Sequence, residues 1–260
     1  MRLLQLLIKV MQHLPSTIRL DHFLVTYSRH SRRAIYSLLN QRAIYLNNVR
    51  CDTLTQFIDP RTDTVRINQT LITPSVERVV YAYHKPTGII TTINDPQERP
   101  CLNPIIDRIP EPVFPVGRLD KDTSGLLLLT NYGQLANYIL HPRYKLSKTY
   151  QVTLPHVLTD AVCQRLRSGF FLNDGPVAVD SIEWLHGQTY QVVISQGRNR
   201  IIRRMFDFFN MPVQVLHRTA IGPIQLHSLT IGSVKRLDTP TLKLLYKTLR
   251  FNDSEYSPSN

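Results

Sequence analysis

Apolar side chains recur at three- and four-residue spacing over residues 17–40. They fall at Leu20, Phe23, Leu24 and Tyr27, and again at Ile35, Leu38 and Leu39. This spacing brings them onto one face of a helix, so we expect two amphipathic helices, with the Ser31 side chain capping the second. Short β-like stretches follow at residues 43–46 and 64–67, bounded by the turn-forming pairs Asn47-Asn48 and Asp59-Pro60. The pattern predicts a small module of helices and short strands.

The segment Thr73-Pro74-Ser75 is interpreted as a linker, and beyond it strand-like runs mix irregularly with helical ones. We expect strands at residues 79–83, 89–93, 126–130, 149–154 and 190–195, and helices at 134–140, 160–167, 199–209 and 242–249. Gly169 stands where a helix C-cap belongs. The predicted fold class is therefore α+β: a small N-terminal α/β module joined to a larger domain with a mixed, mainly antiparallel sheet and flanking helices.

The expected boundaries are an N-terminal extension at 1–16, the small module at 17–74, the large domain at 75–250 and a tail at 251–260. The first fourteen residues are apolar and free of acids, but Arg2, Lys9 and His13 interrupt them too often for a membrane span. Pro15-Ser16 is a poor cleavage site for a secretory signal. A short helical extension on a cytoplasmic protein is the favoured interpretation, and an organellar transit peptide stays open.

The charge balance is the first functional clue. Thirty-one Lys and Arg against 19 Asp and Glu give a net charge of +12, which attracts polyanions and makes nucleic acid or an anionic membrane surface the expected partner. The three cysteines, Cys51, Cys101 and Cys163, are far apart, which fits a reducing compartment and offers no disulfide framework. Histidines are scattered, so we expect no metal and no cofactor.

The segment 115–125, Pro-Val-Gly-Arg-Leu-Asp-Lys-Asp-Thr-Ser-Gly, holds the most informative chemistry. Two carboxylates, Asp120 and Asp122, lie in a polar loop directly before an apolar run that reads as a buried strand, where reactive side chains are held rigidly. Arg118 is placed to keep a neighbouring carboxylate ionised, as a nucleophile must be. From the residues alone, a metal pair, a glycosidase-like pair and an ordinary turn with a surface salt bridge all remain open.

Two further segments add cations and an aromatic ring. Residues 196–206 read as a helix with an apolar stripe at Ile202, Met205 and Phe206, beside which lie Arg200, Arg203 and Arg204. Arginine stays charged when partly buried and binds phosphate or carboxylate with a fork of donors. Residues 144–150 lead into a strand through Tyr150, whose ring is an ordinary strand residue or, in an RNA-binding cleft, a platform for an extruded base.

The sequence Gly-Arg-Leu-Asp-Lys-Asp-Thr-Ser-Gly at 117–125 closely resembles the signature loop of ribosomal RNA pseudouridine synthases of the RsuA/RluB type. Three further matches follow in the family's order, at residues 83–88, 148–150 and 197–204. The resemblance extends from Val79 to the C-terminal helix. It implies an enzyme that isomerises uridine to pseudouridine in RNA, a reaction that requires no redox change and no metal.

The resemblance also implies catalytic roles. Asp120 matches the aspartate that attacks the substrate, and Tyr150 matches the aromatic residue that contacts the target base and helps to remove a proton. Arg203 matches the basic residue that pairs with the catalytic carboxylate, and it is expected to keep Asp120 ionised in a water-poor pocket. Asp122 is expected to stabilise the loop rather than to act as a second catalyst.

Four more residues form the expected substrate-binding set, namely Arg118, Ile202, Arg200 and Lys85. Arg118 matches the arginine associated with holding the target nucleotide outside the RNA helix, and Ile202 matches the apolar contact beneath the base. Extrusion of a nucleotide costs a few kcal/mol, which stacking and phosphate contacts offset.

The small module resembles the alpha-L RNA-binding domain, first described in a small-subunit ribosomal protein, at residues 19–21, 31–34 and 44–47. The match implies RNA contacts by Arg19, Arg32, Arg33 and Arg42, which supply affinity rather than chemistry. Two departures stand out: Gln41-Arg42 and Asn48 occupy places where the family often has glycine. We expect the turn at Asn48 to survive because asparagine tolerates a positive φ.

Together these features predict a stand-alone, monomeric pseudouridine synthase that acts on ribosomal RNA or an assembling subunit in the cytoplasm, without a membrane partner. Residues 94–100 and the Gly-Arg-Asn-Arg form of the arginine motif favour the large-subunit branch. The alternatives are a small-subunit enzyme and a non-catalytic assembly factor, which would be expected to lack Asp120, Tyr150 or Arg203. A base-excising glycosidase, the third alternative, would release free base.

Overall fold

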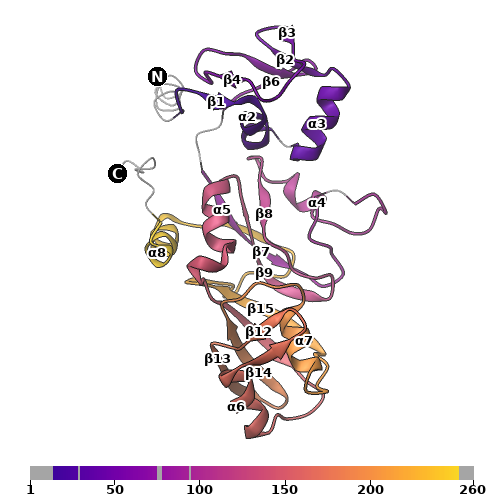
Figure 1. Cartoon of the computed structure of the whole chain (residues 1–260), viewed down its shortest axis with the longest axis vertical. Coiled ribbons are helices and arrows are strands. Elements are labelled where there is room, and N and C mark those ends of the chain that lie inside the picture. Colours follow the sequence, from indigo (N-terminus) through magenta and orange to yellow (C-terminus); the bar gives the residue numbers. More distant parts are fainter. Residues whose placement is uncertain (1–13, 29, 75–77, 94, 252–260) are drawn as a thin grey trace. The chain divides into compact units, whose positions relative to one another are not determined.

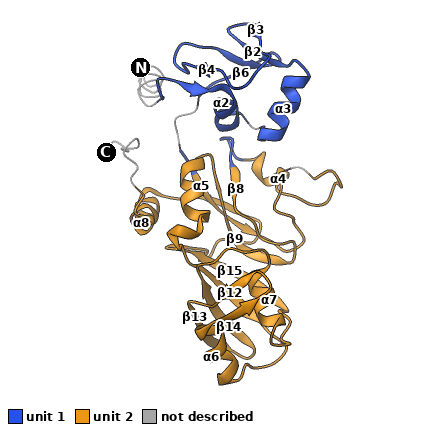
Figure 2. Cartoon of the chain, viewed as in Figure 1, with its two compact units in different colours: residues 1–79, 109–113, 254–260 blue, residues 80–108, 114–253 orange. Residues whose placement is uncertain are grey.

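The computed structural model describes residues 14–28, 30–74, 78–93 and 95–251. The chain divides into two compact units (Figure 2). Unit 1 holds the described residues up to Val79 together with Ile109–Val113, and unit 2 holds Val80–Arg108 and the described residues from Phe114 onward. Most of the expected N-terminal extension, part of the linker and most of the expected tail lie outside the described residues.

Unit 1 combines two helices with short strands. The helices are α2 (Leu20–Tyr27) and α3 (Arg32–Asn40). A four-stranded antiparallel sheet has the order β3-β2-β5-β6, and β1 pairs with β4. The strands are β1 (Ile18–Arg19), β2 (Ile44–Leu46), β3 (Val49–Arg50), β4 (Phe57–Ile58), β5 (Val65–Ile67) and β6 (Thr70–Ile72).

The local chemistry of unit 1 follows the sequence. The Ser31 side chain accepts a hydrogen bond from the Ala34 amide, which confirms the predicted cap of α3. Leu20, Phe23 and Leu24 on α2 and Ile35 on α3 are buried in one core with strand residues from β2, β4 and β5. Asn47 and Asn48 adopt φ values of 49° and 66°, so the asparagine turn forms as expected. Arg42 takes φ 58°, a left-handed conformation that a bulky side chain rarely adopts.

Unit 2 is built on one nine-stranded sheet with the order β13-β14-β10-β15-β9-β7-β17, in which β16 also pairs with β15 and β8 with β9. The strands are β7 (Val80–Lys85), β8 (Phe114–Val116), β9 (Thr123–Thr130), β10 (Lys148–Thr153), β13 (Ser181–His186), β14 (Thr189–Ile194), β15 (Val215–Ile221), β16 (Ile224–Gln225) and β17 (Val234–Arg236). Of these pairings, β9 with β15 is parallel and the others are antiparallel, so the predicted mixed, mainly antiparallel sheet is confirmed.

The helices of unit 2 cover two separate apolar cores along this sheet (Figure 1). One core joins β10, β13 and β14 to α6 and α7, and the other joins β7 and β9 to α5 and α8. The remaining elements are α4, the 3-10 helix η1 and the hairpin β11–β12. The bounds are α4 (Asn103–Ile106), α5 (Gly133–Leu140), η1 (Pro142–Tyr144), α6 (Asp160–Ser168), β11 (Phe170–Leu172), β12 (Gly175–Val177), α7 (Ile201–Asp207) and α8 (Thr239–Leu249).

A parallel contact at the centre of the sheet explains one glycine of the signature loop. Gly125 on β9 pairs with Arg218 on β15 and has φ 111°. A Cβ atom at this position would lie 2.2 Å from the Arg218 carbonyl oxygen, a distance that no real side chain occupies. The two strands that carry the candidate site therefore approach each other only because residue 125 is glycine.

The structure corrects two parts of the sequence-based element assignment. Residues 89–93 form a loop rather than a strand. Their backbone bonds to the loop at Pro100 and Leu102, and the Thr91 hydroxyl bonds to the backbone of Leu119. The sequence patterns also did not predict α4, η1 and the strands β8, β11, β12, β13, β15, β16 and β17. The other predicted strands and helices of unit 2 are present, and Gly169, with φ 89°, caps α6 as expected.

Candidate active site

The loop between β8 and β9 carries Asp120 and is fixed by its neighbours. The Thr91 hydroxyl donates to the Leu119 carbonyl at 2.6 Å and accepts from the Leu119 amide at 3.1 Å. The Gly88 amide donates to the Lys121 carbonyl at 2.7 Å, and the Thr123 amide donates to the Asp120 carbonyl at 3.1 Å. Contacts on both sides of residue 120 therefore define the backbone from which the carboxylate projects.

Lys85 anchors the same loop by hydrogen bonds to its backbone. Its side chain is fully buried, and its ammonium group donates to the carbonyls of Pro86, Asp120 and Thr123 at 2.9, 3.1 and 2.9 Å. Burial lowers the pKa of Lys85 to about 8, against an opposing influence of Asp120 and Asp122. The expectation that Lys85 binds substrate stays a prediction. In the structure its three donors are occupied by the protein's own backbone, so it positions the loop.

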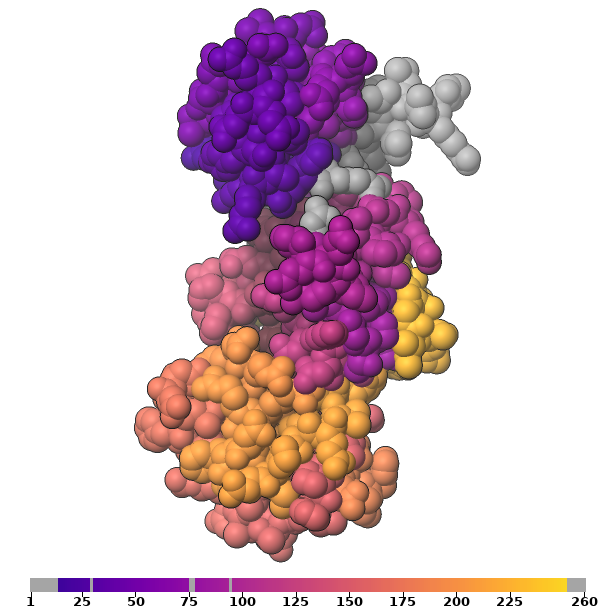
Figure 3. Space-filling model, turned by 90° about the vertical axis from the view of Figure 1, so that its right-hand side faces the viewer, coloured from indigo at the N-terminus to yellow at the C-terminus, as the bar shows by residue number. Residues whose placement is uncertain are grey.

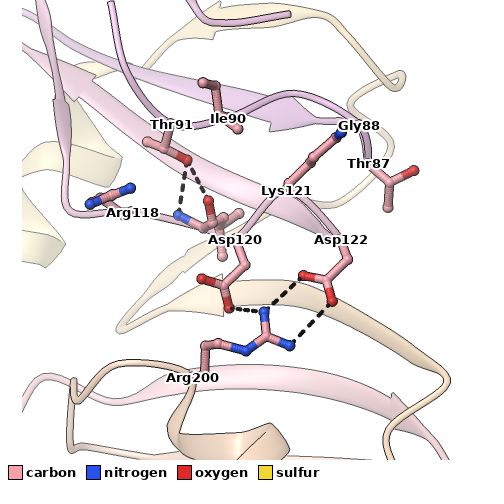
Figure 4. Close-up of a pocket in the computed structure, with 10 residues that line it drawn as sticks. Thr87, Gly88, Ile90, Thr91, Arg118, Asp120, Lys121, Asp122 and Arg200 are labelled. Carbon is pink, nitrogen blue, oxygen red and sulfur yellow. Dashed lines mark hydrogen bonds and ion pairs between the residues drawn. The ribbon is translucent and has the colours of Figure 1, made fainter. Parts of the chain in front are cut away.

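The two carboxylates of the loop share one arginine (Figure 4). Arg200 Nη1 lies 3.6 Å from Asp120 Oδ2 and 3.4 Å from Asp122 Oδ1, so its guanidinium bridges the two acids. Arg200 comes from the N-cap position of α7, where it has φ 45°. A cation at this distance offsets the repulsion between two carboxylates that lie close together.

Arg203 contacts the second carboxylate rather than the first. Its Nη2 lies 3.1 Å from Asp122 Oδ2 and donates to the Asp122 carbonyl at 3.0 Å, and its Nη1 donates to the Val213 carbonyl at 3.0 Å. The ion pair expected between Arg203 and Asp120 is thus replaced by Arg203–Asp122 and Arg200–Asp120. The cause is geometric, since Arg203 is buried and its fork is already engaged by two backbone carbonyls.

A hollow of about 540 Å³ opens beside Asp120. Its lining comes from three segments, the turn after β7, the signature loop and the start of the arginine motif, with Thr87, Gly88, Ile90, Thr91, Arg118, Leu119, Asp120, Lys121, Asp122 and Arg200. The Asp120 side chain is 33% exposed, so the hollow is open to solvent rather than water-poor as expected. Arg118 points away from the two carboxylates, along the wall that Thr91 also lines (Figure 4).

The segment that carries the arginines is anchored to the β11–β12 hairpin. Asp174, in the hairpin turn, forms ion pairs with Arg198 at 2.9 Å and Arg204 at 2.6 Å. Arg198 also donates to the Pro176 carbonyl at 2.8 Å. The space-filling view shows residues near 200, in orange, meeting the magenta and pink surface of residues 85–130 on one face of unit 2 (Figure 3), in agreement with the Arg200–Asp120 ion pair.

Tyr150 and Ile202 lie on the core beneath the arginine motif. Ile202 is buried in the apolar cluster of β10, β13, β14, α6 and α7, and Tyr150 packs against that cluster from β10. The Tyr150 hydroxyl accepts a hydrogen bond from Arg218 Nη1 at 3.5 Å, and the Arg218 guanidinium carbon lies 6.0 Å from the centre of the tyrosine ring. The stacking role expected of Tyr150 is not shown by these contacts and stays a prediction.

Two buried cations were missed by the sequence-based reasoning. Arg218 is 5% exposed, and its Nε donates to the Leu126 carbonyl at 2.7 Å. Lys148 is 9% exposed, and burial together with Arg218 lowers its pKa to about 8. The available signal was a basic residue within an apolar run, Val215–Ile221 for Arg218, but that run was not recognised as a strand.

The arrangement suits carboxylate chemistry on an anionic polymer. An accessible aspartate lies beside a cationic wall, on backbone that the protein fixes at both sides. Among the residues that the structure describes, no group of three or more His, Cys, Asp or Glu side chains could hold a metal ion. In the same described ranges, no helix is long and apolar enough to cross a membrane.

The sequence model for RNA pseudouridylate synthases matches residues 79–208, half of the chain. The chain belongs to this family. A protein of Mycobacterium tuberculosis (strain H37Rv), named as an uncharacterized RNA pseudouridine synthase, is 34% identical over 242 residues, which cover 90% of this chain and 95% of that protein. The crystal structure of a pseudouridylate synthase superposes with a TM-score of 0.64 at 28% identity, over 88% of this chain and 99% of the other.

Two relatives have more specific names. The ribosomal large subunit pseudouridine synthase B of Pseudomonas aeruginosa is 33% identical over 248 residues, 90% of this chain and 63% of that protein. The dual-specificity RNA pseudouridine synthase RluF of Escherichia coli is 32% identical over 245 residues, 94% of this chain and 83% of that protein. The chain is thus an RNA pseudouridine synthase of the RsuA/RluB type, an isomerase.

The family match covers Lys85, Asp120, Tyr150 and Arg203 but ends before Arg218. In unit 1 of this pseudouridine synthase, the expected RNA-binding arginines differ in whether the protein itself already pairs their guanidinium groups. The Arg32, Arg33 and Arg42 side chains are exposed. Arg19 instead forms a two-pronged ion pair with the buried Asp21, at 3.0 and 2.7 Å, so part of its guanidinium is engaged within the protein.

Proposed function

We propose that this enzyme converts a specific uridine of ribosomal RNA, in the large subunit, to pseudouridine, with Asp120 as the nucleophile. The observation that carries the proposal is the geometry of Asp120: an accessible carboxylate on a backbone locked by Lys85 and Thr91, paired with Arg200 at 3.6 Å, inside the region that matches the family. The names of relatives such as the Pseudomonas aeruginosa enzyme support the large subunit as the substrate.

The reaction breaks the bond between uracil N1 and ribose C1′, turns the base and joins its C5 to C1′. The electron pair of the broken bond leaves with the base, and the proton on C5 is lost as N1 gains one, so no atom enters or leaves the product. Asp120 acts on the ribose or on the uracil ring, and Tyr150 contacts the base and assists the proton removal. Arg118 and Arg200 bind the extruded nucleotide, with Arg200 leaving its carboxylates for a phosphate.

Unit 1 is proposed as an RNA-binding module of the alpha-L type, with boundaries near residues 17 and 74. Exposed Arg32 and Arg33 in the first turn of α3 support this role. Cations there oppose the helix dipole, so they do not stabilise the helix, and an external anion is their natural partner. A cytoplasmic, monomeric enzyme remains the prediction of the sequence.

Pseudouridine-specific chemical mapping of ribosomal RNA tests the proposal. We compare cells that express the wild-type chain, Asp120→Asn and Asp107→Asn, an exposed aspartate at the end of α4 that serves as the matched control. The proposal expects one or a few sites in large-subunit RNA to vanish with Asp120→Asn alone. Loss of a small-subunit site favours the small-subunit alternative, and an unchanged map with retained RNA binding indicates a non-catalytic assembly factor.

A dual-specificity enzyme is the second candidate, since the Escherichia coli relative carries that name. It is distinguished by mapping transfer RNA from the same cells. Pseudouridine that disappears from both RNA classes with Asp120→Asn supports dual specificity, and free uracil in the medium of a purified reaction would point to a base-excising glycosidase.

A further inference from the structure

Four residues form one row across four neighbouring strands of unit 2. Tyr150 on β10 pairs with Arg218 on β15, Arg218 pairs with Gly125 on β9, and Gly125 pairs with Lys85 on β7. Because Gly125 has no side chain, the Arg218 backbone packs directly against it, and the row carries two basic side chains, those of Arg218 and Lys85. The row therefore links the strand of Tyr150 to the strand that begins directly after the Asp120 loop.

This row and the nearby Lys148, two residues before Tyr150 on β10, contain more buried positive charge than the protein neutralises. Lys85, Lys148 and Arg218 are 0%, 9% and 5% exposed. Asp180 is the carboxylate that acts favourably on Lys148, and Arg218 has no carboxylate partner among the described residues. Arg218 Nη2 is buried and lacks any hydrogen-bond partner. A buried charge without a counter-charge costs several kcal/mol, and an apolar side chain of similar volume avoids that cost.

The charged groups around Lys148 and Arg218 do not supply the missing anion. Asp120 and Asp122 are paired with Arg200, and Asp122 also with Arg203. Asp180 acts on Lys148 from a distance and accepts a hydrogen bond from the Ser195 hydroxyl at 2.6 Å. The side chains of Lys148 and Tyr150, two residues apart on β10, lie on the same face of the strand. The unbalanced charge thus surrounds the tyrosine that is expected to meet the target base.

We propose that Arg218 and Lys148, here called the cation pair, stabilise the negative charge that uracil carries after its bond to ribose is broken. This inference rests on the proposed function. When the C1′–N1 bond breaks, its electron pair stays on the base whichever atom Asp120 attacks, so the charge on the base lasts until C5 bonds to C1′. Preorganised cations beneath the base lower the energy of that state and need no reorganisation. Arg218 does not itself touch the base. It acts as a positioning residue, through its hydrogen bond to Tyr150 Oη and through its positive charge.

The test exploits the stability of the leaving base. Fluorine at C5 withdraws electrons, so 5-fluorouracil carries a negative charge more easily than uracil and depends less on nearby cations. Two versions of the ribosomal RNA fragment found by mapping are prepared, with uridine or 5-fluorouridine at the target. Single-turnover loss of the original nucleoside is measured by mass spectrometry after nuclease digestion, for the wild-type enzyme, Arg218→Met, Arg218→Lys and Lys148→Met.

Loss of either cation is expected to slow the reaction of uridine more than that of 5-fluorouridine. Arg218→Met slows the reaction of uridine about 100-fold and that of 5-fluorouridine distinctly less, Lys148→Met shows the same ordering, and Arg218→Lys recovers part of the rate. Arg167→Met, which removes an exposed arginine bound to the Ile182 carbonyl, leaves both rates unchanged. Circular dichroism verifies the fold, and the Lys148 variant carries the test if Arg218→Met does not fold.

The outcomes separate the two proposals. Equal losses for uridine and 5-fluorouridine in the folded variants overturn the role of the cation pair, because a purely structural defect slows both substrates alike. A wild-type enzyme that consumes neither nucleoside overturns the proposed function and this inference with it. An inactive Asp120→Asn variant beside an active wild type leaves the proposed function in place whatever the Arg218 variants do.

Discussion

The ammonium group of Lys85 donates a hydrogen bond to the main-chain carbonyl of Asp120, at 3.1 Å, from a fully buried side chain. The hydrogen bond between this lysine and the proposed nucleophile thus goes to the backbone of Asp120 and not to its carboxylate. Two more carbonyls, of Pro86 and Thr123, share the same ammonium group. The position of the Asp120 carboxylate therefore depends on Lys85, a residue whose side chain is not exposed.

Lys85→Met is expected to lower both stability and turnover. Methionine fills the space but removes the ammonium donor from three carbonyls, of which that of Asp120 keeps a second donor, the Thr123 amide. A buried carbonyl left unsatisfied costs about 1–3 kcal/mol. We expect a loss on the order of 3 kcal/mol in the free energy of unfolding, measured with urea, and a fall in kcat with little change in RNA affinity. An unaltered kcat in a destabilised but folded variant would show that the loop keeps its geometry without Lys85.

Lys148→Met is expected to have the opposite effect on stability. The pKa of Lys148 is lowered to about 8 from its ordinary value of 10.5, so the charged form is disfavoured in the folded state. Below pH 8 both states bind the proton and the full cost is present. Between pH 8 and 10.5 the unfolded state binds more protons, so wild-type stability rises with pH. The variant should be more stable at pH 7 by on the order of 2 kcal/mol, with a smaller difference at pH 10.

Gly125→Ala is expected to prevent folding of the central sheet. The added Cβ meets the Arg218 backbone at 2.2 Å, and alanine also strains the φ of 111°. The control is Gly187→Ala, whose glycine has φ 49° and no atom within 4 Å of an added Cβ. We expect the control to lose about 1 kcal/mol and Gly125→Ala to be insoluble or unfolded by circular dichroism. Similar melting temperatures for the two would contradict the close parallel pairing.

Asp122→Asn is expected to separate the two carboxylates of the signature loop. Asp122 takes ion pairs from Arg200 and Arg203, at 3.4 and 3.1 Å, whereas Asp120 takes one from Arg200. Loss of the charge on Asp122 loosens the arginines without removing the nucleophile, so we expect activity to fall about 10-fold, against complete loss with Asp120→Asn. Single-turnover rates decide this point, and equal loss in both variants would make Asp122 a second catalyst.

The double variant Arg32→Gln/Arg33→Gln is expected to weaken RNA binding without affecting chemistry. Both side chains are exposed on α3. Removal of two phosphate contacts should raise KM at constant kcat and reduce the slope of log affinity against log salt by about 1 to 2. Arg61→Gln serves as the control, because Arg61 is already paired with Asp59 at 2.9 Å. An unchanged salt slope in the double variant removes unit 1 from the RNA interface.

The sequence predicted the longer helices and some of the strands because their periodicity is local. The stripe on α2 and the Ser31 cap depend on residues within one or two helical turns, and both are present. β15 escaped prediction because its run includes His217 and Arg218, which read as polar surface until the parallel partner β9 buries them. Local pattern carries no information about a strand that pairs with residues about ninety positions away.

The site was foreseen in its residue types but not in its pairing. The resemblance pointed to Asp120 and to the arginine motif, and the structure places Arg200 beside that aspartate. The left-handed turn at Arg200 and the ion pair at Asp174 decide which arginine pairs with which carboxylate. Neither feature can be derived from the spacing of residues in the sequence. The burial of Lys85 was not foreseen for the same reason, since it follows from the sheet rather than from the neighbours of Lys85 in sequence.

The parallel pairing of β9 with β15 also has a kinetic consequence. These strands are joined by a hydrogen bond between residues 92 positions apart, from Arg218 to Leu126. Contacts of such long range form late and slow the folding of a domain, because the loop must close before the contact stabilises it. A ribosome that is still synthesising residues before 215 holds a nascent chain with Asp120 but without its central strand. Catalytic competence therefore arises only after β15 has emerged from the ribosome and inserted between β9 and β10.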